Sequence, residues 1–391
     1  MNNKQLEEII LKNGFSTFRV KQAKKSVFAR LIADWEEASD LPADLRGLLK
    51  DEIMISEIAP IAREESAKGD AIKILFKTSD GFFVEAVLMK HDRSRHTMTA
   101  PFSAFAGGRR TVCVSSQVGC AMNCSFCATG KLGFQRNLTA SEITDQVLYF
   151  ARWLKDKKET VTNVVYMGMG EPFNNYDNVM ESVRILNDKD GLNLGARHIS
   201  ISTCGVAAGI KKFADEKSQI NPVRNSHETL SRMFAKTKPH LSSHQAEERS
   251  VSNGVNLAIS LHAPTDEIRS KIMPVNLAYP LKKLMPAIAD YVEKTRRKVM
   301  FEYILLGGVN DSDKCARELA GLMKGNKLYH INLIKYHQTF AKGESMPTFR
   351  ASSQEQMRRF FDILKKSGVS CTFRVSFGED ISGACGQLAG K

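Results

Sequence analysis

The residues most suited to chemistry lie in a short loop with three cysteines in a CxxxCxxC spacing, Cys120, Cys124 and Cys127. A cuboidal iron–sulfur cluster is normally held by four thiolates, one on each iron. A loop that supplies three of them leaves one iron open, and the amine and carboxylate of an amino acid fit such an iron. The alternative is a structural zinc site, which normally needs four ligands, usually as two close pairs. The spacing therefore predicts an iron–sulfur cluster with an open iron.

Two further cysteines lie outside that loop, in surroundings of different kinds. Cys113 ends a short apolar segment, and from the residues alone it is more typical of a cysteine packed in a core strand. Cys385 lies between glycines in the segment 380–388, which predicts a flexible loop with an accessible, reactive thiol. A disulfide framework is not expected, because eight cysteines in a cytosolic chain of this size favour metal binding or catalysis.

Glycine and polar residues at the ends of predicted strands form a second group of candidates. Glycines around Glu171 allow the backbone to approach a ligand closely, and Glu171 can bind an amine. His262 stands beside Ser260; the alternative for it is a core histidine with satisfied hydrogen bonds. The candidates for contact with a bound cofactor in this group are Gly170, Glu171, Ser202, Ser260, Leu261 and His262.

These candidates are positioned by a repeating order of strands and helices. The predicted strands lie at 111–114, 163–167, 198–203, 255–262, 299–305 and 329–334. Alternation of strands with helices predicts an α/β fold with a parallel sheet and right-handed crossovers. Six units fit an incomplete (β/α)6 barrel, in which sites gather at the carboxyl ends of the strands. All the unusual motifs of this region are expected to meet there.

The chain divides into four parts. Residues 1–67 have helical spacing of apolar residues and are expected to form a small N-terminal helical domain. Residues 68–110 predict a short β-hairpin followed by a linker. Residues 111–345 form the predicted partial barrel, and residues 346–391 a C-terminal helix, a strand and the Cys385 loop.

One segment interrupts the barrel pattern. Residues 218–254 are rich in Ser, His, Asn and charge, and a linker of this length inside a compact unit indicates a surface insertion. Metal binding by its three histidines is a minor alternative, since no cysteine is near and their spacing is not compact. These histidines are His227, His240 and His244.

Charge and hydropathy limit the class of protein. The net charge of +13 and pI of about 9.3 suit a polyanionic partner such as RNA, although many basic proteins bind no nucleic acid. Basic residues also crowd one N-terminal helix, which is either a solvated face or an RNA-binding face; they are Arg19, Lys21, Lys24, Lys25 and Arg30. No membrane span or signal peptide is expected, so a cytoplasmic protein is predicted. A monomer is expected, as no feature indicates oligomerisation.

At several of these motifs the chain resembles the RlmN/Cfr family of radical S-adenosylmethionine (SAM) RNA methyltransferases, and its RlmN branch most. The resemblance covers most of the chain from Glu85 onward. It is carried by the segments 113–120, 120–127, 167–172, 256–264 and 380–390.

The resemblance implies a two-stage reaction that uses one [4Fe-4S] cluster and two SAM molecules per turnover. One SAM methylates the cysteine that matches Cys385, and a second, on the open iron, is cleaved to a 5′-deoxyadenosyl radical. That radical removes a hydrogen atom from the S-methyl group, and the resulting methylene radical adds to C2 of an adenine in RNA. The cysteine matching Cys113 then releases the product through a transient disulfide, and the carboxylate matching Glu85 accepts a proton.

Three positions depart from the family pattern. Glu85 is followed by a longer stretch before Cys113 than the family usually has, and the alternative for it is an ordinary exposed strand carboxylate. His337 stands where an asparagine commonly contacts SAM, and an imidazole can donate or accept a hydrogen bond in a similar way. Cys204 stands where a serine is common, and no role is assigned to it.

The implied substrates are an adenine of 23S rRNA in the peptidyl-transferase region and the adenine 3′ of the anticodon in tRNAs. An electron donor such as flavodoxin or ferredoxin is implied as a partner. Two alternatives stay open from the sequence: Cfr-like methylation at C8 of the rRNA adenine, which uses the same cysteines, and a non-catalytic RNA-binding protein with a structural metal centre.

Overall fold

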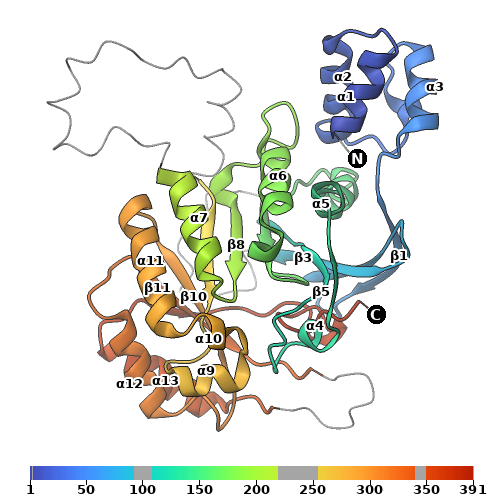
Figure 1. Cartoon of the computed structure of the whole chain (residues 1–391). Helices are drawn as coiled ribbons and strands as arrows, with labels where there is room; N and C mark the ends of the chain where they lie inside the picture. Colours follow the sequence, from blue (N-terminus) through green and yellow to red (C-terminus); the bar gives the residue numbers. More distant parts are fainter. Residues whose placement is uncertain (2, 92–107, 219–253, 340–348, 391) are drawn as a thin grey trace, which may run out of the picture.

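The centre of the molecule is one mixed sheet of ten strands, ordered β1-β2-β3-β4-β7-β8-β9-β10-β11-β12 (Figure 1). The computed structural model describes Met1 and residues 3–91, 108–218, 254–339 and 349–390. Strands β1 to β4 pair antiparallel, and the strands from β4 to β12 pair parallel. The sheet is open at β1 and β12, so its parallel part is an incomplete barrel, as predicted.

All six predicted strands of the barrel are confirmed. β12 adds a seventh parallel strand by pairing with β11, so the C-terminal part of the chain completes the sheet instead of lying beside it. The bounds of the parallel strands are Arg109–Cys113 for β4, Asn163–Tyr166 for β7, Ile199–Thr203 for β8, Asn256–Ser260 for β9, Val299–Leu305 for β10, Tyr329–Lys335 for β11 and Cys371–Phe373 for β12.

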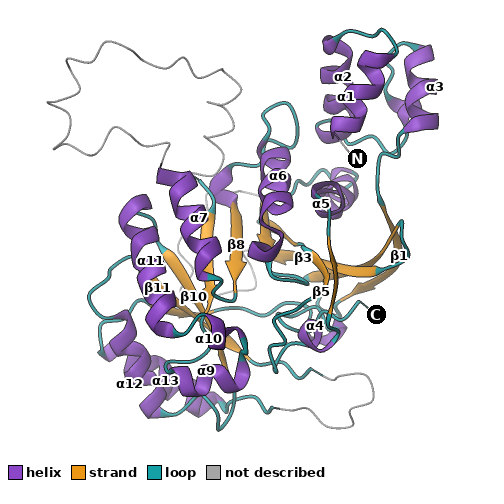
Figure 2. Cartoon of the chain, in the orientation of Figure 1, coloured by secondary structure: helices purple, strands orange, loops and turns teal. Residues whose placement is uncertain are grey.

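Amphipathic helices connect the parallel strands and cover the sheet (Figure 2). The helix after the cluster loop, α5, begins with the expected capping box, in which Thr139 accepts from the Glu142 N–H while the Glu142 carboxylate accepts from the Thr139 N–H. The connecting helices are α5 (Ala140–Lys155), α6 (Tyr176–Asn187), α7 (Ala207–Ser218), α11 (Leu281–Thr295), α12 (Asp313–Met323) and α13 (Gln354–Lys366).

The antiparallel part of the sheet is larger than the predicted hairpin. The hairpin of β2 (Ala71–Thr78) and β3 (Phe83–His91) is confirmed, and β1 (Ile58–Glu65) extends it as an edge strand. The prediction of helix as far as residue 67 is wrong over β1. Seven of the eight β1 residues are exposed, so the strand shows no apolar alternation, and it is recognised only through its pairing with β2.

Three helices form the N-terminal unit: α1 (Asn3–Lys12), α2 (Thr17–Phe28) and α3 (Ala43–Glu52). Their apolar faces pack around buried residues such as Leu6, Val27 and Trp35, and Leu148 of α5 belongs to the same core. The unit is therefore packed against the barrel, at the upper right of Figure 1.

Short elements complete the fold. They are β5 (Gln117–Gly119), α4 (Ala128–Lys131), β6 (Phe134–Asn137), α9 (Asp266–Ile272) and α10 (Val275–Ala278), and the 3-10 turns Trp35–Glu37, Pro172–Asn175, Ala196–His198 and Glu379–Ile381. The predicted insertion at 218–254 and its histidines fall outside the described residues, apart from the two ends of the segment. No helix among the described residues has the length and apolar character needed to cross a membrane.

Candidate active site

The three-cysteine loop lies between β5 and α4 and is held in shape by close backbone contacts. The Cys120 N–H donates to the Gly133 carbonyl at 2.8 Å, and the Cys127 N–H donates to the Cys124 carbonyl at 3.0 Å. Gly119 has a φ of +70°, and a Cβ on it would lie 1.8 Å from the Gly133 oxygen. Only glycine fits at that position, because a side chain would both strain the backbone and displace the strand opposite.

The three thiols line one cavity. The carboxyl ends of β7, β8, β9 and β10 supply much of the rest of the wall. The predicted site residues that line this cavity, beside the three cysteines, are Gly170, Glu171, Ser202, Ser260, His262 and Cys385. The structure therefore brings together residues from positions 120 to 385 of the chain.

The donor set fits an iron–sulfur cluster. Burial raises the pKa of the Cys120 thiol to about 12 and also raises the pKa of Cys124 and Cys127, so bound cations are needed to hold them as thiolates. Among the described residues, no three His, Cys, Asp or Glu side chains are grouped to hold a single metal ion. A cuboidal cluster makes a different demand, because each thiolate binds its own iron.

Glu171 is a buried carboxylate that joins two loops beneath the cavity. Its two oxygens accept hydrogen bonds from the Phe173 N–H at 3.0 Å and the Cys204 N–H at 2.7 Å. Burial raises the pKa of Glu171, and these hydrogen bonds oppose that rise. Gly170 has a φ of +99°, and a Cβ on it would lie 2.6 Å from the Gln117 side chain, so the turn packs directly against β5.

His262 is both a core histidine with satisfied hydrogen bonds and a residue of the cavity wall, which are the two possibilities that the sequence left open. Its Nδ1 accepts from the Ile304 N–H at 3.0 Å, and the Phe126 ring lies edge-on to it at 4.9 Å, so the imidazole is packed and partnered. It also lines the cavity with Ser202 and Ser260, whose hydroxyl oxygens are 3.4 Å apart. Burial, followed by the charge of Arg269, lowers the pKa of His262 to about 3, so the imidazole is neutral.

Leu261 and His337 do not line either of the cavities described here. The Leu261 side chain is fully buried, and its N–H donates to the Glu302 carbonyl. His337 lies within 2.8 Å of the Ser376 hydroxyl and within 3.3 Å of the Glu379 carboxylate, so it fastens the segment that leads to Cys385. Burial lowers the pKa of His337, and Glu379 opposes this effect.

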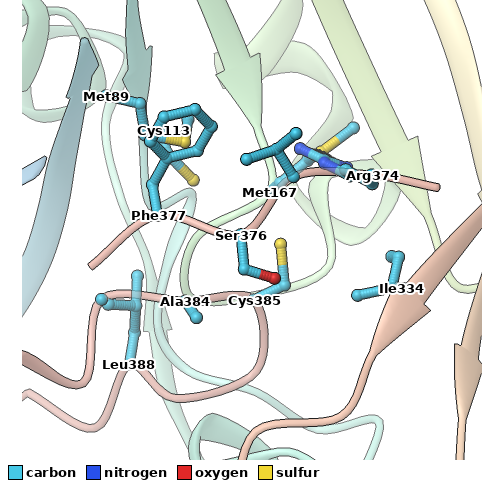
Figure 3. Close-up of a pocket in the computed structure, with 12 residues that line it drawn as sticks. Met89, Cys113, Met167, Ile334, Arg374, Ser376, Phe377, Ala384, Cys385 and Leu388 are labelled. Atoms are coloured by element: carbon cyan, nitrogen blue, oxygen red, sulfur yellow. Dashed lines mark hydrogen bonds between the residues drawn. The ribbon is translucent and has the colours of Figure 1, made fainter. Parts of the chain in front are cut away.

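Cys385 stands between two cavities. The second is lined by Cys113, Cys385, Met167 and Arg374 among others (Figure 3). Cys385 is exposed and lines this cavity as well as the one with the three cluster cysteines. Its loop is tied to the cluster loop, because the Ala128 N–H donates to the Gly386 carbonyl at 2.7 Å and the Thr129 hydroxyl to the Leu388 carbonyl at 2.6 Å.

Cys113 is buried at the end of β4, as its apolar context predicts, yet it also reaches the second cavity. Burial, followed by the proximity of Cys385, raises the pKa of Cys113 to about 12, and the charge of Arg374 opposes this rise. All eight cysteines, each within the described residues, are free.

Arg374 and Glu302 are site residues that the sequence did not reveal. Arg374 lines both cavities, and its guanidinium donates to the Glu302 carboxylate at 3.2 Å and lies 3.3 Å from the Met167 sulfur. A carboxylate inside the apolar strand Val299–Leu305 was a usable signal for Glu302, because such a residue is rarely buried without a partner. Arg374 follows a three-residue strand and has no comparable signal.

Glu85 is 1% exposed, and neither cavity includes it. Its carboxylate accepts from the N–H groups of Ala389 and Gly390, at 2.7 and 3.0 Å, and pairs with Lys73 at 3.3 Å. The exposed strand carboxylate that the sequence left open as an alternative is therefore excluded. In this conformation Glu85 anchors the end of the Cys385 loop.

Comparisons with known proteins agree with this site. The model of the Radical SAM superfamily matches residues 114–224. A probable dual-specificity RNA methyltransferase RlmN of Thermoanaerobacter sp. (strain X514) is 38% identical over 391 residues, which cover 100% of this chain and 97% of that protein. Its counterpart in Staphylococcus aureus (strain JH9) is 38% identical over 387 residues, covering 99% and 91%. The crystal structure of a radical SAM methyltransferase from Sphaerobacter thermophilus superposes with a TM-score of 0.81 at 38% identity, covering 100% of this chain and 98% of that one.

Proposed function

Because the chain belongs to the RlmN family of radical SAM RNA methyltransferases, we propose that it methylates C2 of an adenine in 23S rRNA and in tRNAs. One observation carries the proposal: Cys385 lines both the cavity of the cluster cysteines and the cavity that contains Cys113. A thiol at this junction can receive a methyl group on one side and meet a second thiol on the other. Adenine C2 is electron-poor, so a carbon radical suits it better than a polar methyl transfer.

Cys120, Cys124 and Cys127 would hold a [4Fe-4S] cluster, which together with SAM would supply a 5′-deoxyadenosyl radical. Cys385 carries the methyl group, as its thiolate sulfur takes CH₃ from a first SAM and S-adenosylhomocysteine leaves. The Cys385 methyl group gives up a hydrogen atom to the 5′-deoxyadenosyl radical, and its carbon bonds to C2 of the adenine. The resulting adduct radical then loses the C2 proton and one electron, which returns to the oxidised cluster. Gly170, Glu171, Ser202, Ser260 and His262 are the proposed walls for SAM.

Cys113 is the proposed resolving thiol. Its thiolate attacks the Cys385 sulfur, the bond from that sulfur to the methylene carbon breaks, and the electron pair leaves with the carbon, which takes up a proton to become the methyl group. A Cys113–Cys385 disulfide remains and must be reduced before the next turnover. The two thiols line one cavity, which supports this step.

Glu85 is proposed as the acceptor of the C2 proton, following the family resemblance. In the conformation described, its carboxylate is occupied by Ala389, Gly390 and Lys73. The proton-acceptor role therefore requires the end of the Cys385 loop to release Glu85 when RNA binds.

The proposed reaction also requires an RNA substrate and an electron donor as partners. The net charge of +13 supports binding to rRNA and tRNA. A one-electron donor such as flavodoxin or ferredoxin is required, and RNA substrates of this kind imply a cytoplasmic enzyme. We propose a monomer, since no feature of the sequence indicates oligomerisation.

The first experiment identifies the product. The protein is reconstituted with iron and sulfide without oxygen, reduced, and incubated with SAM and either 23S rRNA fragments or tRNA. We expect 2-methyladenosine in the digested RNA and 5′-deoxyadenosine in the supernatant. Exclusive formation of 8-methyladenosine would establish the Cfr-like activity instead, and no 5′-deoxyadenosine in the presence of RNA would favour a non-catalytic RNA-binding protein.

Two cysteine variants test the assigned roles. Cys385→Ala is expected to lose RNA methylation completely while it keeps its cluster absorbance. Cys113→Ala is expected to accumulate a covalent protein–RNA adduct, visible by denaturing gel electrophoresis. Cys371→Ala removes a thiol that lies in neither cavity and serves as the matched control. If Cys113→Ala turned over like the wild type without an adduct, the resolving role would be wrong.

A further inference from the structure

Arg269 of α9 is a fully buried guanidinium with no anionic hydrogen-bond partner among the described residues. It donates to the carbonyls of Leu261 and Cys204, at 3.1 and 2.5 Å, and to the Asn276 side-chain oxygen at 2.8 Å. Its remaining contacts, at 3.5 Å, are also to carbonyl oxygens, those of Tyr279 and Ser260. Every acceptor is therefore a neutral oxygen.

A buried cation in such surroundings is unfavourable unless an anion lies near it, because neutral dipoles only partly replace its hydration. Burial lowers the pKa of Arg269, and the proximity of Cys204, Cys124 and the Asp266 carboxylate opposes that effect. Cys124 is one of the three cluster cysteines, so an anionic cluster bound there would supply a countercharge to Arg269.

The fold holds Arg269 against that site from behind. The last residue of α9, Ile272, accepts hydrogen bonds from the N–H and the hydroxyl of Ser125, at 3.0 and 3.2 Å, and Ser125 adjoins Cys124. The Cys204 backbone links Arg269 to Glu171 on the cavity wall. Arg269 itself is 0% exposed and does not line the cavity. It therefore acts on a group in the cavity through its charge, without contact.

We propose that Arg269 is the fixed countercharge of the iron–sulfur cluster and raises the reduction potential of that cluster. This inference rests on the proposed function, which places a cluster at the three cysteines. Three thiolates give the cluster a net negative charge, and reduction adds one more electron to it. A fixed positive charge nearby stabilises the reduced form more than the oxidised form.

The test compares three substitutions in the full-length, reconstituted protein. Arg269→Gln keeps amide donors toward the carbonyls but removes the charge, Arg269→Met removes both, and Arg269→Lys keeps the charge. The cluster potential is measured by an EPR-monitored redox titration without RNA. At a fixed potential near the wild-type midpoint, we expect the ratio of reduced to oxidised cluster to fall about tenfold in the Gln and Met variants and to stay within about twofold in the Lys variant.

The control is Arg152→Met, which removes a partly buried cation whose hydrogen bond goes to the Ile32 carbonyl beside the N-terminal unit. Its cluster potential should equal that of the wild type. If the Gln and Met variants fold by circular dichroism but fail to take up iron while Lys succeeds, the need for a positive charge is equally supported.

Three results overturn the inference: an unchanged potential in loaded Gln or Met variants, a Lys variant that behaves like Gln and Met, or weaker SAM binding at an unchanged potential, which would assign the charge of Arg269 to SAM instead. Failure of the proposed function is distinguishable: without a cluster the wild-type protein would show no [4Fe-4S] signal at all, whereas a different RNA product such as 8-methyladenosine would leave the cluster and its potential unchanged.

Discussion

At the scale of single residues, the site depends on charges and thiols that are buried together. Cys113 is a thiol inside the end of a strand, and its burial disfavours the thiolate that a resolving cysteine needs. Arg374 is the cation that opposes this effect, held in place by Glu302. The reactive group and the charge that activates it therefore come from β4 and from the segment after β12, at opposite ends of the parallel sheet.

Replacement of Arg374 should slow the resolving step. In Arg374→Met the pKa of Cys113 rises further above its ordinary value, because the opposing positive charge is absent. We expect the covalent protein–RNA adduct to persist at least about tenfold longer at pH 8, which corresponds to a pKa change of one unit. The amount of adduct that remains is measured over time in quenched samples on denaturing gels.

Arg374→Lys should recover part of the rate, as it keeps the charge. Arg359→Met is the control, since Arg359 pairs with Asp313 on the surface of α13. Equal adduct lifetimes in Arg374→Met and wild type would contradict this role.

His262 should make the fold sensitive to acid. Its pKa is about 3 in the folded protein and about 6.5 when unfolded, so between these values the unfolded state binds the extra proton. Stability is therefore lost as the pH falls from about 6.5 towards 3, by up to about 1.4 kcal/mol for each pH unit.

The comparison that isolates this effect is His262→Asn against wild type in urea unfolding of the cluster-free protein at pH 7, 6, 5 and 4. The difference in unfolding free energy between the two should shift in favour of the variant as the pH falls. Parallel curves would show that His262 does not carry the effect.

At the scale of elements, the cluster loop depends on a tight contact between β5 and the residue before β6. Gly119 and Gly133 both have φ near +70°, at +70° and +71°. The two glycines differ in the room available for a side chain. A Cβ on Gly119 would lie 1.8 Å from the Gly133 oxygen, whereas a Cβ on Gly133 meets no atom within 4 Å. Alanine at either position would suffer backbone strain, but only alanine at position 119 would also clash with another atom, so the two substitutions distinguish the two effects.

Gly119→Ala is expected to abolish cluster uptake, because the clash displaces the turn that positions Cys120. Gly133→Ala is the matched control and should retain its iron, with a loss of stability of about 1 kcal/mol from strain. Iron content per protein and cluster absorbance after reconstitution give the answer. Normal iron content in Gly119→Ala would show that the loop adapts more freely than its packing indicates.

At the scale of the whole molecule, the N-terminal unit adds one helix rich in basic residues, α2. Several basic residues of the second helix are paired within the unit, as Lys24 is with Glu7 and Arg30 with Asp40. Lys21 and Lys25 are exposed on α2. They are the residues of this helix best placed to meet RNA phosphates if the unit binds RNA.

Charge reversal tests this surface. Lys21→Glu with Lys25→Glu should raise the KM for RNA and reduce the salt dependence of binding, by about 0.7–0.9 in logarithmic slope for each phosphate that the variant no longer neutralises. The kcat should remain within about twofold, as the barrel is untouched. Lys282→Glu with Lys324→Glu makes the same change of charge on α11 and after α12. Equal effects of the two pairs would mean that only net charge matters.

Much of this molecule was determined by local sequence. The spacing of Cys120, Cys124 and Cys127, the six parallel strands and the capping box at Thr139 are short-range patterns, and each strand and the capping box were predicted correctly in type. The edge strand β1 was not, because its residues are mostly exposed and only pairing with β2 makes them a strand.

What only the tertiary structure decided is how distant residues meet. Cys385 lies 272 positions after Cys113, and no local pattern states that they line one cavity. The placement of Arg374 beside both, of Glu85 under the end of the Cys385 loop, and of Arg269 behind Cys124 depends in the same way on strand order and loop packing. The reason is physical: residue types and spacing set local geometry, whereas charge pairing and burial exist only once the chain has folded.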